Sequence, residues 1–211
     1  MLSWLLLPVT YLFGSVSFAW LAARAKGIDL RSHGSGNLGA TNAGRVLGRK
    51  WFFIIFSADL AKGLLPVLVA LALVESGHAH GTLPVLTAAC AILGHSFTCF
   101  HGFKGGKAVA TSLGVLIGLV YLAAAITFGI WLLVWAVCYT VFRLKASDAV
   151  GPASVIAALA MPFAHLATFP QPWALLNLPL TIFLFLVATL VIVRHRSNIA
   201  KLLGKTPPPA E

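Results

Sequence analysis

The stretch AVATSLGVLIGLVYLAAAITFGIWLLVWAVCYTVF, residues 108–142, decides the fold of this chain. It is 35 residues long without a charged side chain, and Lys107 and Arg143 lie immediately on either side of it. As one helix it would measure about 52 Å, whereas the hydrocarbon core of a bilayer is about 30 Å thick. Because basic loops stay on the cytoplasmic side, both ends face one side and the run has to cross twice. We expect two short helices joined by an outer turn near residues 120–127.

The rest of the chain has the same character. Of 211 residues, 59% are hydrophobic and 9% are charged, whereas about a quarter of a soluble domain is charged. Five further apolar runs are found at residues 2–23, 51–74, 83–100, 149–166 and 176–193. The sequence therefore predicts an all-α polytopic membrane protein with seven transmembrane helices, formed by one catalytic domain over residues 1–211.

The basic residues set the expected orientation. The net charge of +10 would suggest nucleic-acid binding in a soluble protein, but 14 of the 15 basic residues lie in the segments between and after the apolar runs. They occupy the predicted cytoplasmic loops 24–50, 101–107 and 143–148 and the C-terminal tail 194–211. The positive-inside rule then places the N-terminus outside and the C-terminus in the cytoplasm, and the charges need no nucleic acid to explain them.

The first apolar run is expected to be a retained helix. A signal peptide normally has basic residues before its apolar run, and no Lys or Arg precedes this one.

Asp59 and Lys62, three residues apart in the second run, are expected to form a structural ion pair that faces the bundle; a proton or ion relay is the alternative. The last residues, TPPPAE, are expected to be a disordered tail.

A glycine-containing loop, HGSGNLGATNAGR at residues 33–45, follows the first run. Its glycines allow tight turns that bring backbone N–H groups close to a ligand. Ser35, Asn37, Thr41 and Asn42 add neutral hydrogen-bonding groups, and Arg45 adds a guanidinium suited to phosphate. The pattern favours an anion site, and an ordinary polar connection with capping residues is the alternative.

A second loop, GHSFTCFHGFKGGKAVATS at residues 94–112, places Gly105 and Gly106 between Lys104 and Lys107. A helix is expected to begin near Ala108, so its N-terminal N–H groups would face the same place as the lysines. The segment lacks the pattern of a Walker A loop. A basic turn anchored at lipid headgroups is the alternative.

The last cytoplasmic segment, RHRSNIAKLL at residues 194–203, holds His195 and Asn198, which share a face if the helix continues through them. A capping role for the histidine, or binding of anionic lipid by the basic residues, would also explain this segment.

Taken in order, GSGNLGATNAGR, DLAKG (residues 59–63), GH…FKGGKAVAT and HRSNI resemble the motifs of the bacterial membrane glycerol-3-phosphate acyltransferases that use acyl phosphate. The resemblance extends from Gly14 to about Leu203. It implies a multi-pass enzyme of the bacterial inner membrane, with its active site on the cytoplasmic side. The implied reaction moves a fatty acyl group to the position 1 hydroxyl of glycerol 3-phosphate and gives lysophosphatidic acid and phosphate. No cofactor, metal or obligatory protein partner is implied; the partners are the two substrates and the lipid bilayer.

The resemblance also assigns roles to residues. It implies catalytic roles for His195 and Asn198. It implies phosphate binding by Ser35, Gly36, Asn37, Arg45, Lys104, Gly105, Gly106 and Lys107. Arg143 matches a further family position, and Ser147 is a candidate for a hydroxyl role beside it.

The sequence departs from the family pattern at four positions. Ala146 and Asp148 stand where serines are expected, Thr98 where a proline is usual and Ala108 where a glycine is usual.

The residues agree with acyl transfer from an activated anhydride. Acyl phosphate needs its partner hydroxyl held in line and its charge stabilised, which suits a site of cations and N–H donors. None of the seven histidines is followed by an acidic residue five positions later, so the signature of CoA-dependent acyltransferases is absent from the sequence.

The rival from another class is a membrane transporter for a phosphorylated or anionic solute, which should carry polar or charged groups along several helices. A CDP-alcohol phosphotransferase is a third possibility, but it needs clustered aspartates for metal, whereas this sequence has only five acidic residues and none of them cluster.

Overall fold

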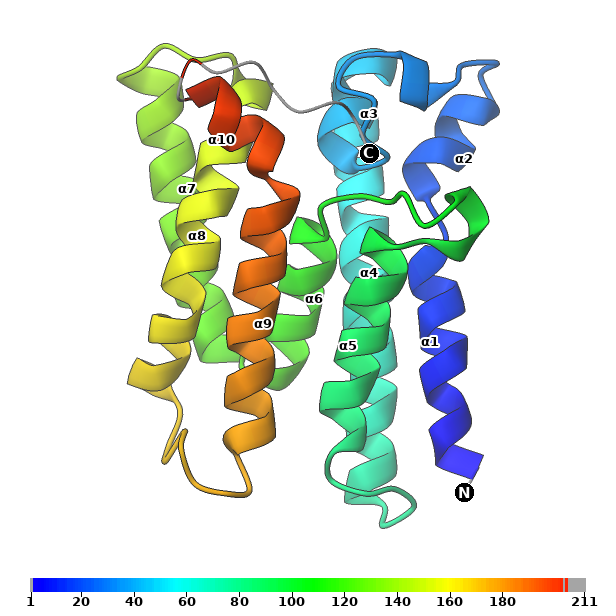
Figure 1. Cartoon of the computed structure of the whole chain (residues 1–211), viewed down its shortest axis with the longest axis vertical. Coiled ribbons are helices and arrows are strands. Elements are labelled where there is room, and N and C mark those ends of the chain that lie inside the picture. The colour runs from blue at the N-terminus through cyan, green and yellow to red at the C-terminus, as the bar shows by residue number, and fades with distance from the viewer. Residues whose placement is uncertain (1, 203, 205–211) are drawn as a thin grey trace. The chain divides into compact units, whose positions relative to one another are not determined.

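The computed structural model describes residues 2–202 and residue 204, and every regular element among them is a helix (Figure 1). The predicted tail TPPPAE lies outside the described residues. The helices form two compact units that divide between Leu119 and Val120, and each unit is described by itself. A single catalytic domain over residues 1–211 stays a prediction.

Unit 1 contains the N-terminal helices. Its α-helices are α1 (Leu6–Ser15), α2 (Phe18–Arg24), α3 (Ala40–Leu47), α4 (Arg49–Glu75), α5 (Leu83–Ser96) and α6 (Val109–Leu119). Short 3-10 turns are η1 (Leu2–Leu5), η2 (Leu30–Ser32) and η3 (Cys99–His101). α1 packs on α5, α4 packs on both α5 and α6, and α3 packs on α4.

Glycines bring the helices of unit 1 into backbone contact. Gly14 and Gly94 lie where α1 meets α5, and Gly63 and Gly114 lie where α4 meets α6. At each of these positions a Cβ atom would overlap the main chain of the facing helix. Small residues at contacts of this kind are typical of helices that pack inside a membrane.

Unit 2 contains α7 (Tyr121–Thr140), α8 (Ala146–Thr168), α9 (Leu178–Arg194) and α10 (Arg196–Leu202). α7 packs along α8, α8 packs on α9, and α10 packs on both. The indole of Trp131 donates to Ser154 Oγ at 3.1 Å, and that of Trp135 donates to the Ala146 carbonyl at 3.0 Å. Trp131 and Trp135 also stack on each other, with centroids 6.4 Å apart and planes inclined by 9°.

Four helical stretches are long and apolar enough to cross a membrane: Arg49–Glu75, Leu83–His101, Tyr121–Thr140 and Ala146–Thr168. The pair Leu2–Ser15 and Phe18–Arg24, bent by 41°, makes a fifth if it forms one span. Val109–Leu119 and Leu178–Arg194 are apolar but shorter. The protein is therefore an all-helical membrane protein with four to five candidate spans of full length. The count of seven and the orientation of the termini stay predictions.

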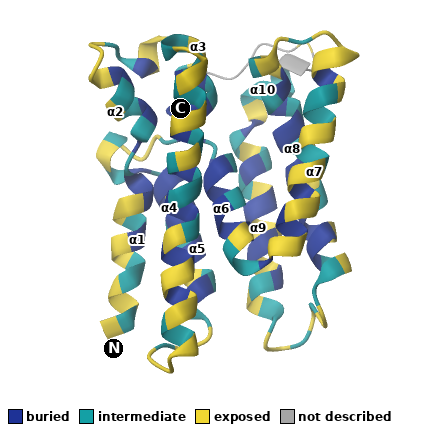
Figure 2. Ribbon diagram, turned by 180° about the vertical axis from the view of Figure 1, so that it is seen from behind, coloured by how far each residue is buried: buried dark blue, intermediate teal, exposed yellow. Residues whose placement is uncertain are grey.

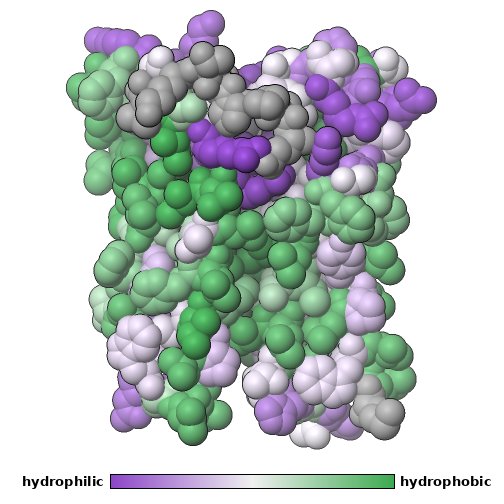
Figure 3. All heavy atoms as spheres, viewed as in Figure 1, coloured by the Kyte–Doolittle hydropathy of each residue, from purple (hydrophilic) through white to green (hydrophobic). Residues whose placement is uncertain are grey.

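The surfaces of both units agree with a lipid environment. Leu65, Leu133 and Leu186 are all more than half exposed, and Figure 2 shows exposed residues along α1, α4 and α7. In Figure 3 hydrophobic side chains cover the middle of each unit and hydrophilic ones gather at the ends. Water-soluble surfaces rarely carry apolar patches of this extent.

The long apolar run contains a break at Val120, within the predicted range. Val120 has φ −147° and ψ 62°, which is not helical, and it separates the last residue of α6 from the first residue of α7. The prediction of two helices in this run is confirmed.

Candidate active site

The first glycine-containing loop is built on one buried side chain, Asn42 of α3. Its Oδ1 accepts from the Ser35 amide at 2.8 Å, and its Nδ2 donates to the carbonyls of Leu30 at 3.3 Å and His33 at 3.1 Å. Gly34 adopts a positive φ of 62° in the turn that Asn42 holds. Asn42, which the sequence suggested as one of several loop polar groups, therefore fixes the loop instead of facing a ligand.

The predicted phosphate-binding residues of this loop lie around that core. Ser35 is exposed, and Gly36 and Asn37 are half-buried. Arg45 is exposed in the last turn of α3. Because residues 40–47 form a helix, Arg45 has a fixed position relative to the loop, which the sequence did not predict.

The same end of unit 1 carries an exposed ion pair. Arg31 contacts both carboxylate oxygens of Asp29, at 3.1 and 3.2 Å. Hydrogen bonds from the Arg31 side chain and amide hold the pKa of the Asp29 carboxyl below its ordinary value. Arg31 is therefore neutralised locally, and it is not among the residues assigned to substrate.

The second loop is tied to the end of α5 through its main chain. The amide of Gly105 donates to the Ser96 carbonyl at 3.1 Å, and that of Gly106 donates to the His95 carbonyl at 3.0 Å. A Cβ at Gly105 would overlap the His95 carbonyl, and one at Gly106 would overlap the His95 ring. Both glycines are required for this close approach, and their N–H groups already have main-chain acceptors.

The lysines of this loop are positioned by that contact. Lys104 is exposed and Lys107 is half-buried. α6 begins at Val109, which agrees with the predicted start near Ala108, so the N–H groups of its first turn lie directly after Lys107. Phosphate binding by Lys104, Gly105, Gly106 and Lys107 stays a prediction.

The structure explains two of the departures from the family pattern, Ala108 and Thr98. Ala108 has φ 58°, in the left-handed region that a glycine adopts without strain. Thr98 has φ −65°, which a proline would also adopt, and its hydroxyl donates to the Ser15 carbonyl at 2.7 Å. Thr98 therefore makes a hydrogen bond that a proline could not make.

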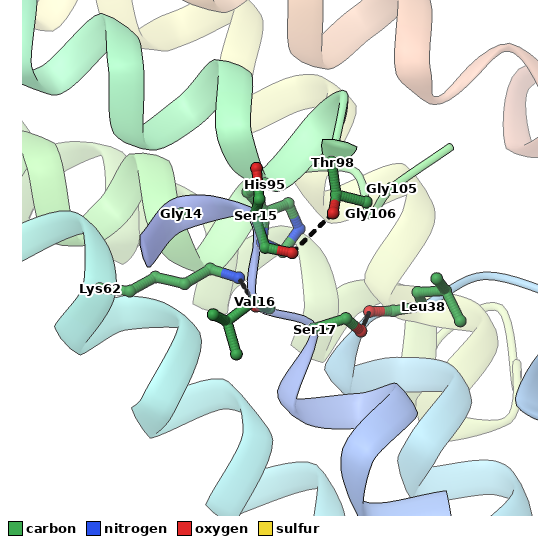
Figure 4. A pocket seen from close by; sticks show the side chains of 10 residues that line it. All are labelled: Gly14, Ser15, Val16, Ser17, Leu38, Lys62, His95, Thr98, Gly105 and Gly106. Carbon is green, nitrogen blue, oxygen red and sulfur yellow. Dashed lines mark hydrogen bonds between the residues drawn. The ribbon is translucent and has the colours of Figure 1, made fainter. Parts of the chain in front are cut away.

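A small polar pocket lies beneath both loops of unit 1 (Figure 4). Its empty space of about 170 Å³ includes open solvent, and the pocket itself has room for about one water molecule. Its lining comes from the break between α1 and α2 (residues 14–17), from Leu38, Lys62, His95 and Thr98, and from Gly105 and Gly106. Ser15 is buried there, and its hydroxyl has no hydrogen-bond partner among the described residues.

The predicted ion pair is confirmed at the base of this pocket. Lys62 Nζ lies 2.9 Å from Asp59 Oδ1, and the two residues are 1% and 3% exposed. His95, the histidine of the GH motif, lies beside them with Nδ1 3.7 Å from the same oxygen, a contact that the sequence did not predict. A histidine in the middle of an apolar run was the available signal, because buried polar groups need partners.

In unit 2, His195 joins α9 to α10 and is buried. Its Nδ1 donates to the Val191 carbonyl at 2.7 Å, so the neutral ring carries its lone pair on Nε2. The helix does not continue through His195, which has φ −97° and ψ 9°, so the condition for a helical face shared with Asn198 is not met. The two residues are linked differently, through a bond from the Asn198 amide to the His195 carbonyl at 2.8 Å.

Asn198 lies against α8, where a Cβ at Gly151 would overlap its side-chain amide. Arg143 is exposed between α7 and α8 with φ 55°, and Ser147 is half-buried in the first turn of α8. Asp148 is in that same first turn, where a carboxylate interacts favourably with the helix dipole. This interaction with the helix dipole is a structural role for Asp148, which stands where the family pattern has a serine.

Comparisons with known proteins agree over the whole chain. The family model described as glycerol-3-phosphate acyltransferase matches residues 4–205. The chain is 40% identical over 203 residues to the glycerol-3-phosphate acyltransferase of Pseudomonas putida strain GB-1, covering 95% of this chain and 96% of that protein. It is 37% identical over 194 residues to the corresponding protein of Aquifex aeolicus, covering 92% and 91%.

Two solved structures are also similar. One is the crystal structure of PlsY, an integral membrane glycerol 3-phosphate acyltransferase, in its glycerol 3-phosphate form, with a TM-score of 0.81 and 32% identity over 99% of this chain and 96% of that chain. The other is the lysophosphatidic acid form of PlsY, with a TM-score of 0.78 and 31% identity over 100% of this chain and 97% of that chain.

Proposed function

This chain belongs to the glycerol-3-phosphate acyltransferase family, and from that premise we propose that it transfers a fatty acyl group from acyl phosphate to the position 1 hydroxyl of glycerol 3-phosphate. The products are lysophosphatidic acid and inorganic phosphate. The observation that carries the proposal is the match of the whole chain, in sequence and in fold, to enzymes named for this acceptor. The two anchored loops of unit 1, which carry Arg45, Lys104 and Lys107, supply cations for phosphate groups.

The reaction requires little chemistry from the protein. The hydroxyl oxygen attacks the acyl carbonyl carbon, a new C–O ester bond forms, and the C–O bond to phosphate breaks. The hydroxyl proton passes to His195 or to a substrate phosphate. His195 suits the first route because its lone pair is on Nε2, and Asn198 is proposed to position the hydroxyl with it.

We further propose seven crossings with the N-terminus outside, and loops 24–50, 101–107 and 143–148 on the cytoplasmic side of the inner membrane. The break at Val120 supports two crossings in the run 108–142. Labelling of single cysteines by a membrane-impermeant maleimide, in a variant lacking Cys90, Cys99 and Cys138, tests this. A cysteine replacing Gly81 should react from outside, and one replacing Lys50 only after the membrane is opened.

The deciding assay supplies purified protein with glycerol 3-phosphate and either acyl phosphate or acyl-CoA. Turnover with acyl phosphate alone is expected. Use of acyl-CoA alone would overturn the donor, and flux of solute across vesicles without acylation would favour a transporter.

Two substitutions test the residues. Lys107→Ala and His195→Ala should each lower turnover by about 100-fold or more, because each removes an interaction with reacting or charged groups. Lys50→Ala, an exposed cation, and His78→Ala, a histidine bonded to Ser76, are the matched controls and should stay within about twofold. Near wild-type turnover of both test variants would refute the site assignment.

A further inference from the structure

Two main-chain carbonyls at the break between α1 and α2 accept hydrogen bonds from other elements. The Ser15 carbonyl accepts from Thr98 Oγ1 at 2.7 Å, and the Val16 carbonyl accepts from Lys62 Nζ at 2.9 Å (Figure 4). A break interrupts the helical pattern at these carbonyls, and an unpaired buried carbonyl is costly. The bent conformation of this segment therefore depends on two side chains, Lys62 of α4 and Thr98, which precedes η3.

The second observation concerns the charge on Lys62. Its Nζ is paired with Asp59 and lies 5.6 Å from the centre of the Phe18 ring, out of reach of solvent. Buried ion pairs add little net stability, because desolvation of both charges offsets their attraction. The bond to the Val16 carbonyl gives this pair a role besides stability, since it fixes the path of the main chain at the break.

His95 connects the pair to the second loop. Thr111 Oγ1 lies 3.1 Å from His95 Nδ1, on the same side of the ring as Asp59. The opposite edge, with Nε2, faces Gly106, which also donates its amide to the His95 carbonyl. The segment that carries Lys104 therefore packs directly on a ring whose orientation Thr111 and Asp59 set.

The first loop is fastened to the same break. Ser17 Oγ donates to the Leu38 carbonyl at 3.4 Å, and Leu38 lies between Asn37 and the start of α3. Figure 4 shows Leu38 and the two glycines of the second loop around one pocket, with Lys62 extending from α4 toward Val16. Both loops predicted to bind phosphate thus share one buried support.

We infer that Asp59, Lys62 and His95 form a positioning network that holds the two glycine-containing loops at the spacing their phosphate ligands require. The inference rests on the proposed function for the identity of those ligands. The three residues act through the loops, so their loss should weaken substrate binding more than it slows the chemical step.

The kinetic test uses two variants that are expected to fold. Thr111→Val removes the hydroxyl beside His95, and Asp59→Leu with Lys62→Met replaces the ion pair by apolar side chains of similar size, an exchange that folds well in other proteins. Each should raise KM for glycerol 3-phosphate by about 10-fold while kcat stays within about threefold. Thr87→Val is the matched control, because Thr87 is buried in α5 with a hydroxyl that has no partner among the described residues.

A simple loss of folded protein would give a different result. It lowers the number of active molecules and hence kcat, but leaves KM unchanged. Unchanged KM in both variants, with kcat falling in proportion to the folded fraction, would overturn the inference.

A second measurement does not depend on the reaction. Trypsin cleavage after Lys104, followed by mass spectrometry on the folded protein, should be about 10-fold faster in both variants because the loop is no longer held on His95. Thr87→Val should be cleaved at the wild-type rate. If both variants are cleaved faster than the wild type, but the wild type fails to acylate glycerol 3-phosphate, the positioning network stands and the proposed function is refuted. Unchanged cleavage and unchanged KM in an active enzyme would refute the network alone.

Discussion

The two glycine-containing loops of unit 1 have similar compositions and different constructions. In the first, Gly34 is needed for its positive φ, and the loop is held by the side chain of Asn42. In the second, Gly105 and Gly106 are needed because the main chain passes too close to His95 for a Cβ. A Cβ at Gly34 would also overlap the Asn42 side-chain amide. Glycine thus serves both conformation and packing in the first loop and packing alone in the second, and substitutions should separate the two roles.

The largest effect is expected from Gly106→Ala in the second loop. The added methyl would overlap the buried His95 ring, so the loop has to move away from its support. Turnover should fall by about 100-fold or more, and thermal unfolding should begin at a lower temperature, as for other overpacked sites. Gly81→Ala, where a Cβ meets open space, is the control and should change neither quantity. A fully active Gly106→Ala enzyme would show that the close approach is dispensable.

A smaller effect is expected from Asn42→Ala in the first loop. The substitution removes three hydrogen bonds and leaves the carbonyls of Leu30 and His33 to find other donors. Loss of a buried partner costs about 1–3 kcal/mol, and the loop should sample other conformations, raising KM for glycerol 3-phosphate by about 10-fold. Steady-state kinetics over a range of acceptor concentrations measures this. Asn177→Ala, which removes an amide bonded to two carbonyls in another loop, should leave KM unchanged.

Ala108→Gly should improve the second loop. Ala108 has φ 58°, a conformation that costs a residue with a Cβ about 1 kcal/mol and costs glycine much less. The variant should therefore unfold at a temperature a few degrees higher, with turnover within about twofold of wild type. A lower unfolding temperature would mean that the Ala108 methyl contributes more by packing than it loses by strain.

The smallest effect is expected at the exposed pair beside the first loop. Arg31→Met removes the side-chain hydrogen bonds, which are the main cause of the lowered pKa of Asp29, and keeps the bond from the amide of residue 31. A carboxyl with a lowered pKa adds stability that is fully present above its ordinary titration range and is lost as the pH falls through the lowered pKa. Between about pH 6 and pH 8 Asp29 is ionised with or without Arg31, so its protonation state does not change in this range. Turnover across this range should stay within about twofold of wild type. A tenfold loss would give Arg31 a role in the site.

The sequence predicted the features that depend on short stretches of chain. The length and charge-free composition of residues 108–142 predicted a break, which is found at Val120. The spacing of Asp59 and Lys62 predicted their ion pair, because residues three apart share a helical face.

Features that depend on contacts between distant segments were not predictable in this way. Residues 40–47 are too few and too polar to indicate a helix by pattern, so the capping of the loop by Asn42 was missed. The role of His95 depends on its contacts with Thr111 and Gly106, which tertiary packing brings beside it and which the sequence pattern does not show. At His195 the helical pattern continues in sequence, whereas the chain turns there.

The stacked indoles of Trp131 and Trp135 give unit 2 an optical signature of its own. Two aromatic transitions at a centroid distance of 6.4 Å, with nearly parallel planes and both rings fixed by hydrogen bonds to α8, should couple and produce a paired positive and negative band in circular dichroism. Both rings belong to α7 and their hydrogen bonds to α8 fix their orientation, so the band should weaken when α7 separates from α8. Detergent extraction and thermal unfolding of this half of the chain can then be followed with no label attached.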